Sequence, residues 1–241
     1  MKSEAIVELG KPLQTIESET PEPKGKEVLL KITHSGVCHS DVHIHDGYFD
    51  LGGGNKLPVG QMLNLPHTMG HEIEGEVAAI GPDVTDVEIG ANVVAYPWIG
   101  CGECATCKAG DEHYCNAPRQ LGIQLPGGFA DYCIVPDSKY VLDYTGIRPG
   151  LAATYMCSGL TAFGALKKFV NITDEDHILI MGLGGVGMMG LQFARALFNC
   201  KILAADIDPN KLQAAKGAGA DEVYDTSDAV SYTHLTLPTK A

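Results

Sequence analysis

The segment HILIMGLGGVGMMGLQFARAL, residues 177–197, constrains the fold more than any other part of this sequence. An apolar stretch typical of a buried β-strand leads into a glycine-rich turn and then into an apolar helical pattern. The glycines follow the spacing Gly182-x-Gly184-x-x-Gly187. In this spacing the first glycine permits a tight turn, the second lets a pyrophosphate approach the backbone, and the third allows close packing of helix and strand. A dinucleotide-binding turn is therefore predicted; a glycine-rich turn in another α/β unit is the alternative.

A second apolar strand, KILAAD, follows this helix and ends at Asp206, nineteen residues after Gly187. An acid at this distance binds the adenosine ribose hydroxyls of a dinucleotide. Because its charge repels a 2′-phosphate, Asp206 favours NAD over NADP. Strand, helix, second strand and terminal acid together predict a Rossmann unit with a parallel sheet.

Four cysteines lie close together in CGECATCKAGDEHYC, residues 101–115. Gaps of two residues let thiolates converge on one ion, and four thiolates make a closed tetrahedral zinc site with no position left for water. Such a site is structural. An iron–sulfur cluster and a redox Cys-x-x-Cys pair are the competing interpretations. The predicted zinc ligands are Cys101, Cys104, Cys107 and Cys115.

Composition excludes several classes of function for the 241-residue chain. The formal net charge is −13, so no basic surface is available for a nucleic-acid partner. No apolar run reaches the roughly 20 residues of a membrane span, and the N-terminus MKSEAIVELGK lacks an apolar signal core. A cytoplasmic protein without membrane contact is expected. In that compartment eight cysteines argue against a disulfide framework.

Three further candidate metal ligands are Cys38 in GVCHSD, His71 in GHE and Cys157 in YMCSGLTA. Each lies in a turn that carries glycine or serine, beside an apolar run. Taken singly, each residue also fits a buried packing position or a surface histidine. Three ligands would leave the fourth position of a zinc ion open to a water or an alcohol.

In this order, GVCHSD, GHE, the four-cysteine lobe, YMCSGLTA and GLGGVG resemble the motifs of zinc-dependent alcohol dehydrogenases of the medium-chain dehydrogenase/reductase superfamily. The matching motifs run from Gly36 to about Asp225 and cover most of the chain. The resemblance implies a GroES-like β-barrel catalytic domain followed by an α/β Rossmann NAD-binding domain. It also implies two Zn²⁺ per chain, NAD as the cofactor, and reversible oxidation of a small alcohol to an aldehyde or ketone. The family forms homo-oligomers, which we expect for the parent protein.

The resemblance also assigns roles to individual residues. Cys38, His71 and Cys157 would hold the catalytic zinc, a Lewis acid toward the alcohol oxygen. Ser40 would take the alcohol proton and pass it by way of the cofactor ribose to His43. The remaining assignments are Asp41 and Glu72 around the ligands, His39 at the cofactor phosphate and Lys211 at the adenosine ribose.

Aromatic residues provide candidates for a substrate pocket. Tyr48 and Phe49 stand in a Gly-rich segment between the first two ligands, and Trp98 precedes the cysteine lobe. These side chains could line an apolar pocket, or Tyr48 and Phe49 could simply anchor a loop. Cys133 and Cys200 are expected to be packing residues.

Two alternatives to an alcohol dehydrogenase remain. One is a polyol or other secondary-alcohol dehydrogenase of the same superfamily, although those enzymes often carry a carboxylate where Cys157 stands. The other is a zinc-binding module without catalysis.

We expect a catalytic domain over residues 1–150, a partial Rossmann domain over 151–229 and a non-native tail over 230–241. The final segment, SYTHLTLPTKA, shows neither helical nor strand periodicity and does not resemble the family. VSYTHL is similar to a reading frame of a transposon-end adapter. A chain truncated within its cofactor domain, and therefore inactive by itself, is predicted.

Overall fold

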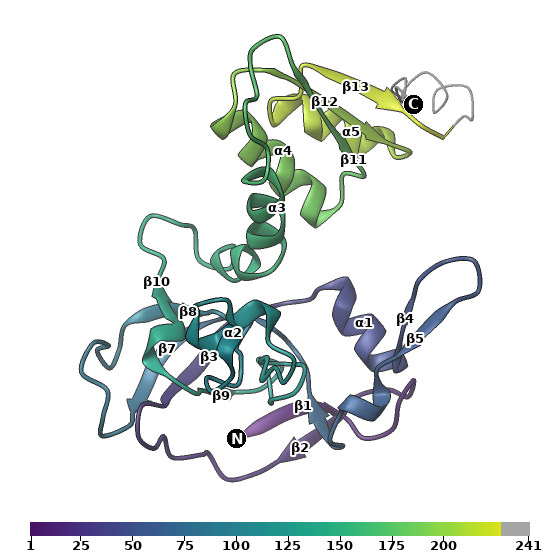
Figure 1. Ribbon diagram of the computed structural model, residues 1–241. Helices are drawn as coiled ribbons and strands as arrows, with labels where there is room; N and C mark the ends of the chain where they lie inside the picture. The colour runs from purple at the N-terminus through teal and green to yellow at the C-terminus, as the bar shows by residue number, and fades with distance from the viewer. Residues whose placement is uncertain (228–241) are drawn as a thin grey trace. The chain divides into compact units, whose positions relative to one another are not determined.

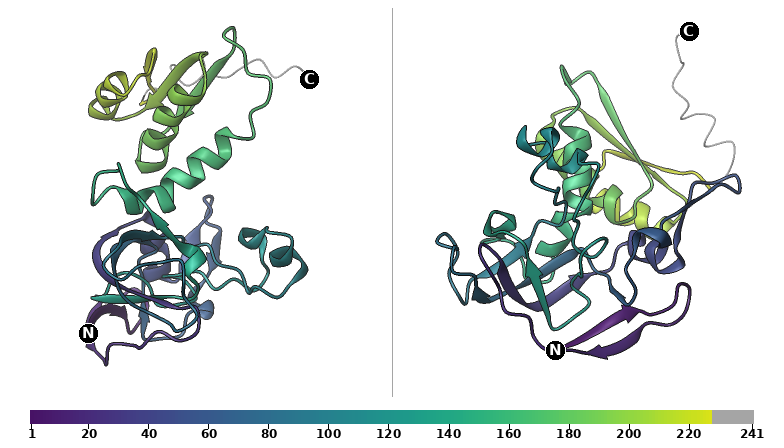
Figure 2. Two further views of the ribbon diagram at one scale, coloured as in Figure 1. Left: turned by 90° about the vertical axis from the view of Figure 1, so that its left-hand side faces the viewer. Right: turned by 60° about the horizontal axis from the view of Figure 1, so that its bottom comes forward.

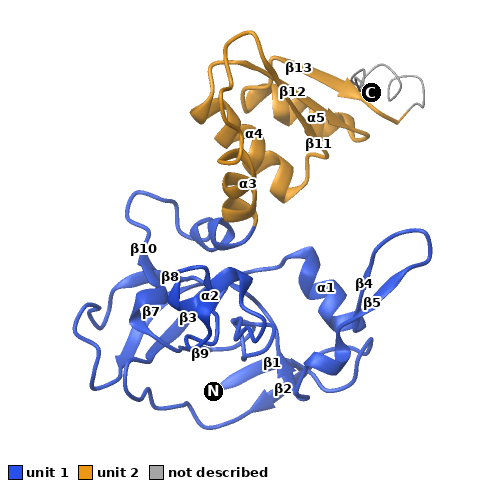
Figure 3. Cartoon of the chain, viewed as in Figure 1, with its two compact units in different colours: residues 1–157 blue, residues 158–241 orange. Residues whose placement is uncertain are grey.

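The computed structural model describes residues 1–227 and divides the chain into two compact units, one spanning Met1–Cys157 and one beginning at Ser158 (Figure 3). The first unit ends seven residues beyond the expected boundary at residue 150. The extra residues are the 3-10 helix η4 (Ala152–Met156), which packs beside strands of the first unit, and the residue on either side of it. The segment expected to be non-native, 230–241, lies outside the described residues.

Antiparallel β-structure dominates the first unit (Figure 1). A five-stranded sheet has the order β10-β8-β7-β3-β9, and a three-stranded sheet has the order β2-β1-β6. A separate hairpin pairs β4 with β5. These strands are β1 (Lys2–Ile6), β2 (Gln14–Glu17), β3 (Val28–Gly36), β4 (Tyr48–Asp50), β5 (Lys56–Pro58), β6 (His67–Thr68), β7 (Glu72–Ile80), β8 (Asn92–Ala95), β9 (Tyr132–Val135) and β10 (Val141–Asp143).

The core of the first unit forms where β3, β7, β8 and β9 pair. Val28 and Leu30 of β3 and Ile73 and Val77 of β7 are fully buried there. Their spacing of two or four residues follows from the alternation of side chains along a strand. The predicted GroES-like antiparallel fold is confirmed for this part of the chain.

Short helices connect the strands of the first unit. They are α1 (His39–Asp46), α2 (Ala105–Lys108), η1 (Gly60–Met62), η2 (Glu112–Tyr114), η3 (Ser138–Tyr140) and η4 (Ala152–Met156). In the left-hand view of Figure 2 the segment around α2 stands out from the sheets as a small lobe. This lobe carries the four closely spaced cysteines.

Helices and parallel strands alternate in the second unit, as predicted. Its elements are α3 (Ser158–Leu166), β11 (His177–Met181), α4 (Gly185–Leu197), β12 (Lys201–Asp206), α5 (Pro209–Gly217) and β13 (Glu222–Asp225). The sheet has the order β11-β12-β13, with both pairs parallel. Parallel strands need crossover helices, which α4 and α5 supply. Among residues 1–227, no helix is both long and apolar enough to cross a membrane.

Candidate metal centres and cofactor turn

The four cysteines of the lobe converge on one point. The Sγ–Sγ distances are 3.9 Å for Cys101–Cys107, 3.5 Å for Cys104–Cys107 and 3.8 Å for Cys104–Cys115. Four thiolates about 2.3 Å from a central zinc would lie about 3.8 Å from one another. A disulfide would need about 2.0 Å, and all eight cysteines are free. The sulfur positions therefore suit one tetrahedral ion.

Backbone amides of the lobe point at these sulfurs. Cys104 caps the N-terminus of α2, and its Sγ accepts the N–H of Cys107 at 3.4 Å. The Sγ atoms of Cys101 and Cys115 each accept an amide as well. Hydrogen bonds of this kind lower the pKa of Cys101 to about 6, the largest contribution coming from the amide of Glu103. The amides thus favour the thiolate form of Cys101, whereas burial raises the pKa of Cys107 to about 12.

Glu112, which the sequence did not single out, ties the lobe to η3, the 3-10 helix that directly precedes β10. Its carboxylate accepts hydrogen bonds from the Tyr140 hydroxyl, from Lys139 Nζ at 2.6 Å and from the Gly100 amide at 3.2 Å. Burial alone would raise the pKa of Glu112, but the bonds from Lys139 and Tyr140 outweigh it and lower the pKa. The sequence signal was an acid inside the cysteine spacing, indistinguishable there from a solvent-exposed charge.

Cys38, His71 and Cys157 are brought together from three distant parts of the first unit. Cys38 is the N-cap of α1, His71 immediately precedes β7, and Cys157 directly follows η4. The Sγ atoms of the two cysteines are 3.8 Å apart, and His71 Nε2 lies 3.3 Å from Cys157 Sγ. His71 and Cys157 are buried, at 0% and 7% exposure. Only the fold creates this site, because residues 38 and 157 are 119 positions apart.

This donor set fits a zinc ion with one open position. Two sulfurs about 2.3 Å from zinc would be about 3.8 Å apart, and a sulfur and an imidazole nitrogen about 3.6 Å apart. The pKa of Cys38 is lowered to about 3, chiefly by the hydrogen bond from the Cys157 thiol and then by that from His71. A thiolate is the form of cysteine that binds metal. Burial alone would lower the pKa of His71. The hydrogen bonds and charges of Asp41 and Cys38 outweigh this effect and raise the pKa to about 9.

Asp41 and Glu72 both lie close to the three candidate ligands. Asp41 Oδ1 is 3.2 Å from His71 Nδ1, and its other oxygen accepts the Cys38 amide at 2.9 Å. A carboxylate on the second nitrogen fixes the orientation of a metal-binding histidine. Glu72 is buried, with a carboxylate oxygen within 4.8 Å of the ligand atoms. Its pKa is raised to about 7, first by burial and then by the Cys38 charge.

Helix α1 carries the residues proposed for the proton relay. The backbone and side chain of Ser40 are among the groups that lower the pKa of Cys38, after Cys157 and His71. The His43 ring lies between two others, with centroids 4.7 Å from His39 and 4.8 Å from Phe49. Ser40, His39 and His43 all belong to α1, which begins directly after the candidate ligand Cys38.

The three aromatic residues predicted as candidates for a substrate pocket have different surroundings. The Trp98 ring centroid is 5.8 Å from that of His71, and its Nε1 donates to the Met156 carbonyl at 2.8 Å. Tyr48 belongs to the β4–β5 hairpin, where Lys56 Nζ lies 3.6 Å from its ring centroid. Of the three, Trp98 is the one in contact with the metal-ligand set.

The glycine turn of the second unit has the predicted steric basis. A Cβ atom on Gly187 would lie 1.8 Å from the carbonyl oxygen of Gly182, so helix α4 can approach β11 only with glycine at 187. Gly182 has a φ of 81°, which also favours glycine. A Cβ on Gly184 would meet no atom within 4 Å. The backbone there is open to a ligand, as the fingerprint requires.

Asp206 closes one side of this turn at the end of β12. Its carboxylate accepts the amides of Leu183 at 2.6 Å and Asp208 at 2.9 Å, and these bonds lower its pKa. Lys211 Nζ lies 3.8 Å from Asp206 Oδ1. A pocket of about 160 Å³ opens here, lined by Met181, Gly182, Ala205, Asp206, Ile207 and Thr226.

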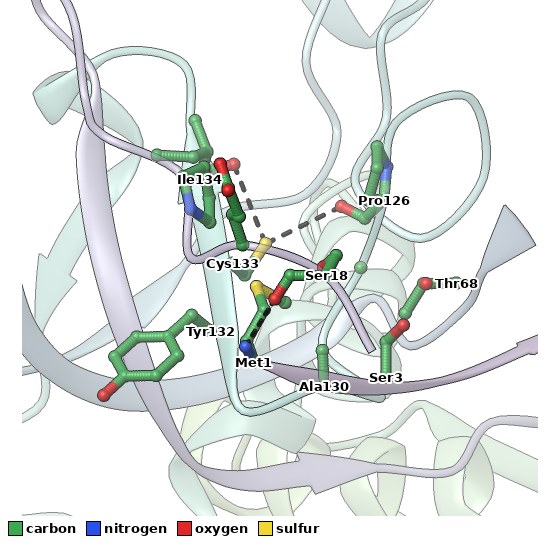
Figure 4. A pocket seen from close by; sticks show the side chains of 12 residues that line it. Met1, Ser3, Ser18, Thr68, Pro126, Ala130, Tyr132, Cys133 and Ile134 are labelled. Atoms are coloured by element: carbon green, nitrogen blue, oxygen red, sulfur yellow. Dashed lines mark hydrogen bonds between the residues drawn. The ribbon is translucent and has the colours of Figure 1, made fainter. Parts of the chain in front are cut away.

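A larger pocket, of about 360 Å³, contains none of the predicted site residues (Figure 4). It lies between the N-terminal strand and β9, and the Cys133 thiol faces it. That thiol donates to the Pro126 carbonyl at 3.6 Å, and burial raises its pKa to about 12. A protonated, buried thiol is unreactive, which agrees with a packing role for Cys133.

Comparison with known proteins places both units in one family. Residues 24–145, half of the chain, match the alcohol dehydrogenase GroES-like domain, and residues 185–236 match the zinc-binding dehydrogenase family. The latter match reaches into the segment expected to be non-native. An NAD-dependent alcohol dehydrogenase of Saccharolobus solfataricus is 40% identical over 229 residues, which cover 94% of this chain and 65% of that protein.

Solved structures agree with the sequence matches. The alcohol dehydrogenase of the archaeon Aeropyrum pernix superposes with a TM-score of 0.83 at 28% identity, covering 96% of this chain and 67% of that one. The D-arabinose dehydrogenase of Sulfolobus solfataricus gives 0.80 at 28% identity, covering 96% and 69%. The chain belongs to the zinc-dependent alcohol dehydrogenase family of the medium-chain dehydrogenase/reductase superfamily.

Proposed function

We propose that the whole protein oxidises a small alcohol reversibly to an aldehyde or ketone, with hydride transfer to NAD and with a zinc ion held by Cys38, His71 and Cys157. The observation that carries this proposal is the convergence of the Cys38 sulfur and the His71 imidazole on Cys157 Sγ, at 3.8 and 3.3 Å. When bound, zinc supplies Lewis-acid polarisation of the alcohol oxygen. The chain spans about 65% of the S. solfataricus relative, so the activity is assigned to the whole protein.

Individual residues of this chain would then have separate roles in the reaction. Asp41 holds the His71 ring in one orientation, and Ser40 is placed beside Cys38 to accept and pass on the alcohol proton. A hydroxyl suits this step because it donates and accepts at once. His43 is the proposed proton exit, and Trp98 the proposed apolar wall of the substrate pocket.

The second unit would bind the cofactor. Gly182, Gly184 and Gly187 leave room for the pyrophosphate, and Asp206 is proposed to bind the adenosine ribose, with Lys211 and His39 as further cofactor contacts. The low pKa of Asp206 keeps it ionised at neutral pH, which disfavours a 2′-phosphate. NAD is therefore proposed over NADP.

The test is the oxidation of primary, secondary and aryl alcohols by the whole zinc-loaded protein, followed by NADH absorbance. Ser40→Ala should lower kcat about 10²- to 10⁴-fold, the range of a lost proton-transfer step. Absence of turnover with both NAD and NADP across the panel would reject the enzyme assignment. NAD binding without turnover would favour the non-catalytic zinc module.

A polyol dehydrogenase is the second candidate. The similarity to a D-arabinose dehydrogenase supports it, and the thiol of Cys157 in place of a carboxylate speaks for the simple-alcohol branch. Polyols and sugars in the same assay panel separate the two by their kcat/KM values.

A cytoplasmic location and a homo-oligomer are further proposals. All eight cysteines are free thiols, and thiols of this number persist in a reducing compartment.

A further inference from the structure

Strand β7 carries a second buried carboxylate, Glu74, two residues beyond Glu72. Its exposure is 1%, and it lies directly opposite His34 in the β3–β7 pairing. A buried carboxylate needs hydrogen-bond donors to offset its lost hydration. Glu74 has three: the Gly150 amide at 3.0 Å from both carboxylate oxygens, the Tyr144 hydroxyl at 3.2 Å and His34 Nδ1 at 3.0 Å.

The hydrogen bond from the Gly150 amide to Glu74 is the one that bears on the metal site. Gly150 begins the short segment that continues through η4 to Cys157. Glu72, on the same face of β7, lies beside Cys157 at the far end of this segment. Two carboxylates two residues apart on one strand thus lie at the two ends of the segment that presents the third candidate ligand, and Glu74 accepts a hydrogen bond from its first residue.

The backbone at Gly150 adopts a conformation that favours glycine. Its φ is 79°, and an added Cβ would come within 3.3 Å of the His34 ring. Within the segment, Thr154 Oγ1 donates to the Leu151 carbonyl at 2.7 Å, and Trp98 Nε1 fixes the Met156 carbonyl. The segment is therefore a short, internally bonded strut whose start is set by Glu74.

We propose that Glu74 is a positioning residue for the catalytic zinc site: by holding the Gly150 amide, it sets the place of Cys157 relative to Cys38 and His71. This inference rests on the proposed function, because it assumes that these three residues bind a metal. Glu74 does not belong to the group of candidate metal ligands around Cys38, His71 and Cys157, so its proposed action is through the Gly150 amide. Loss of the carboxylate should let Cys157 depart from its position while Cys38 and His71 stay in place.

The test measures metal affinity in the 241-residue chain, by zinc competition with a chromophoric chelator and by the absorption of the cobalt-substituted protein. Glu74→Gln keeps the size of the side chain but removes its charge and replaces one of the two oxygens that accept the Gly150 N–H with an NH2 group, which can only donate. We expect zinc to bind the Cys38–His71–Cys157 site about 10- to 100-fold more weakly, as for other residues that orient metal ligands. The cobalt bands of that site should change shape, while those of the four-thiolate site stay unchanged.

Glu76→Gln is the matched control, because Glu76 is an exposed glutamate of the same strand. It should leave both metal affinities as in the original chain. If Glu74→Gln lowers thermal stability but leaves the zinc affinity and cobalt spectrum unaltered, Glu74 is merely structural and the inference is wrong. If the unsubstituted chain binds no zinc at the Cys38–His71–Cys157 site, the proposed function fails instead, so the two failures are distinguishable.

Discussion

Cys38 Sγ and Cys157 Sγ lie 3.8 Å apart, although 119 residues separate them in the chain. The distance is nearly twice that of a disulfide and close to that of two thiolates on one zinc ion. The hydrogen bond from Cys157 also makes Cys38 the more acidic of the two. Removal of a metal ion from this pair should therefore change the reactivity of Cys38.

Chelation of zinc should make Cys38 reactive toward alkylation. With a pKa of about 3, Cys38 is a thiolate throughout the neutral range, and the thiolate is the nucleophile. We expect iodoacetamide to modify it in the chelator-treated chain already at pH 6, and zinc to prevent this. Peptide mass spectrometry over time gives the rates. Cys133, buried and with a pKa of about 12, is the internal control and should stay unmodified in both samples.

Gly187→Ala should destabilise the second unit strongly. Its Cβ would come within 1.8 Å of the Gly182 carbonyl oxygen, so helix α4 must move away from β11. We expect a loss of roughly 1–3 kcal/mol in the free energy of unfolding, typical of overpacking, measured by urea denaturation. Gly185→Ala is the matched control: its Cβ meets no atom within 4 Å, so stability should be unchanged or slightly higher. Equal stability of the two variants would contradict the packing argument.

Asp206→Asn should weaken NAD binding and also destabilise the turn. The carboxylate accepts two backbone amides, and an amide group would turn a donor toward one of them. About 1–2 kcal/mol of unfolding free energy should be lost at pH 7.

The effect of Asp206→Asn should also depend on pH. The pKa of Asp206 is lower in the folded chain than its ordinary value of 3.8, so its stabilisation is complete above about pH 4 and disappears as the pH falls through the folded-state pKa. The gap between the original chain and Asp206→Asn should therefore narrow below pH 4. A gap that widened on acidification would refute this assignment.

Glu112→Gln should make the cysteine lobe more mobile without loss of zinc from the four-cysteine site. The substitution removes the charge that pairs with Lys139, while the four sulfurs keep their positions on the lobe itself. We predict faster hydrogen exchange over residues 101–115 with unchanged zinc at the four-cysteine site. Lys139→Gln should give the same change in exchange, because it removes the partner of the same contact; an unaffected lobe in both variants would contradict the anchoring role.

Local patterns in the sequence were sufficient for much of the fold. KILAAD is a strand over its whole length, and the apolar residues before Gly182 form β11, because period, glycine turn and terminal acid are all local signals. The lobe was equally readable, since its ligands lie within fifteen residues. The boundary between the units was harder to predict. It depends on the packing of η4 against β7, and no residue near η4 in the sequence indicates this contact.

The single-residue roles depended on the family resemblance and on long-range contacts. Nothing in the sequence near Cys157 indicates that it meets Cys38, and no pattern pointed to Glu74. The one feature that could have drawn attention to Glu74 is its position two residues after Glu72, on the same face of a strand that is mostly buried. A charged residue in such a position has to find donors, but their identity, including Gly150, is decided by pairing across the sheet.

Zinc per chain, measured by elemental analysis of the purified and dialysed protein, tests the central claim most directly. We predict two zinc ions: one on Cys101, Cys104, Cys107 and Cys115, and one on Cys38, His71 and Cys157. Cys200→Ser, which changes a buried cysteine outside both sets, should keep two, whereas Cys157→Ser should keep one. A single zinc in the unsubstituted chain, or none, would contradict the claim that the first unit builds both metal sites.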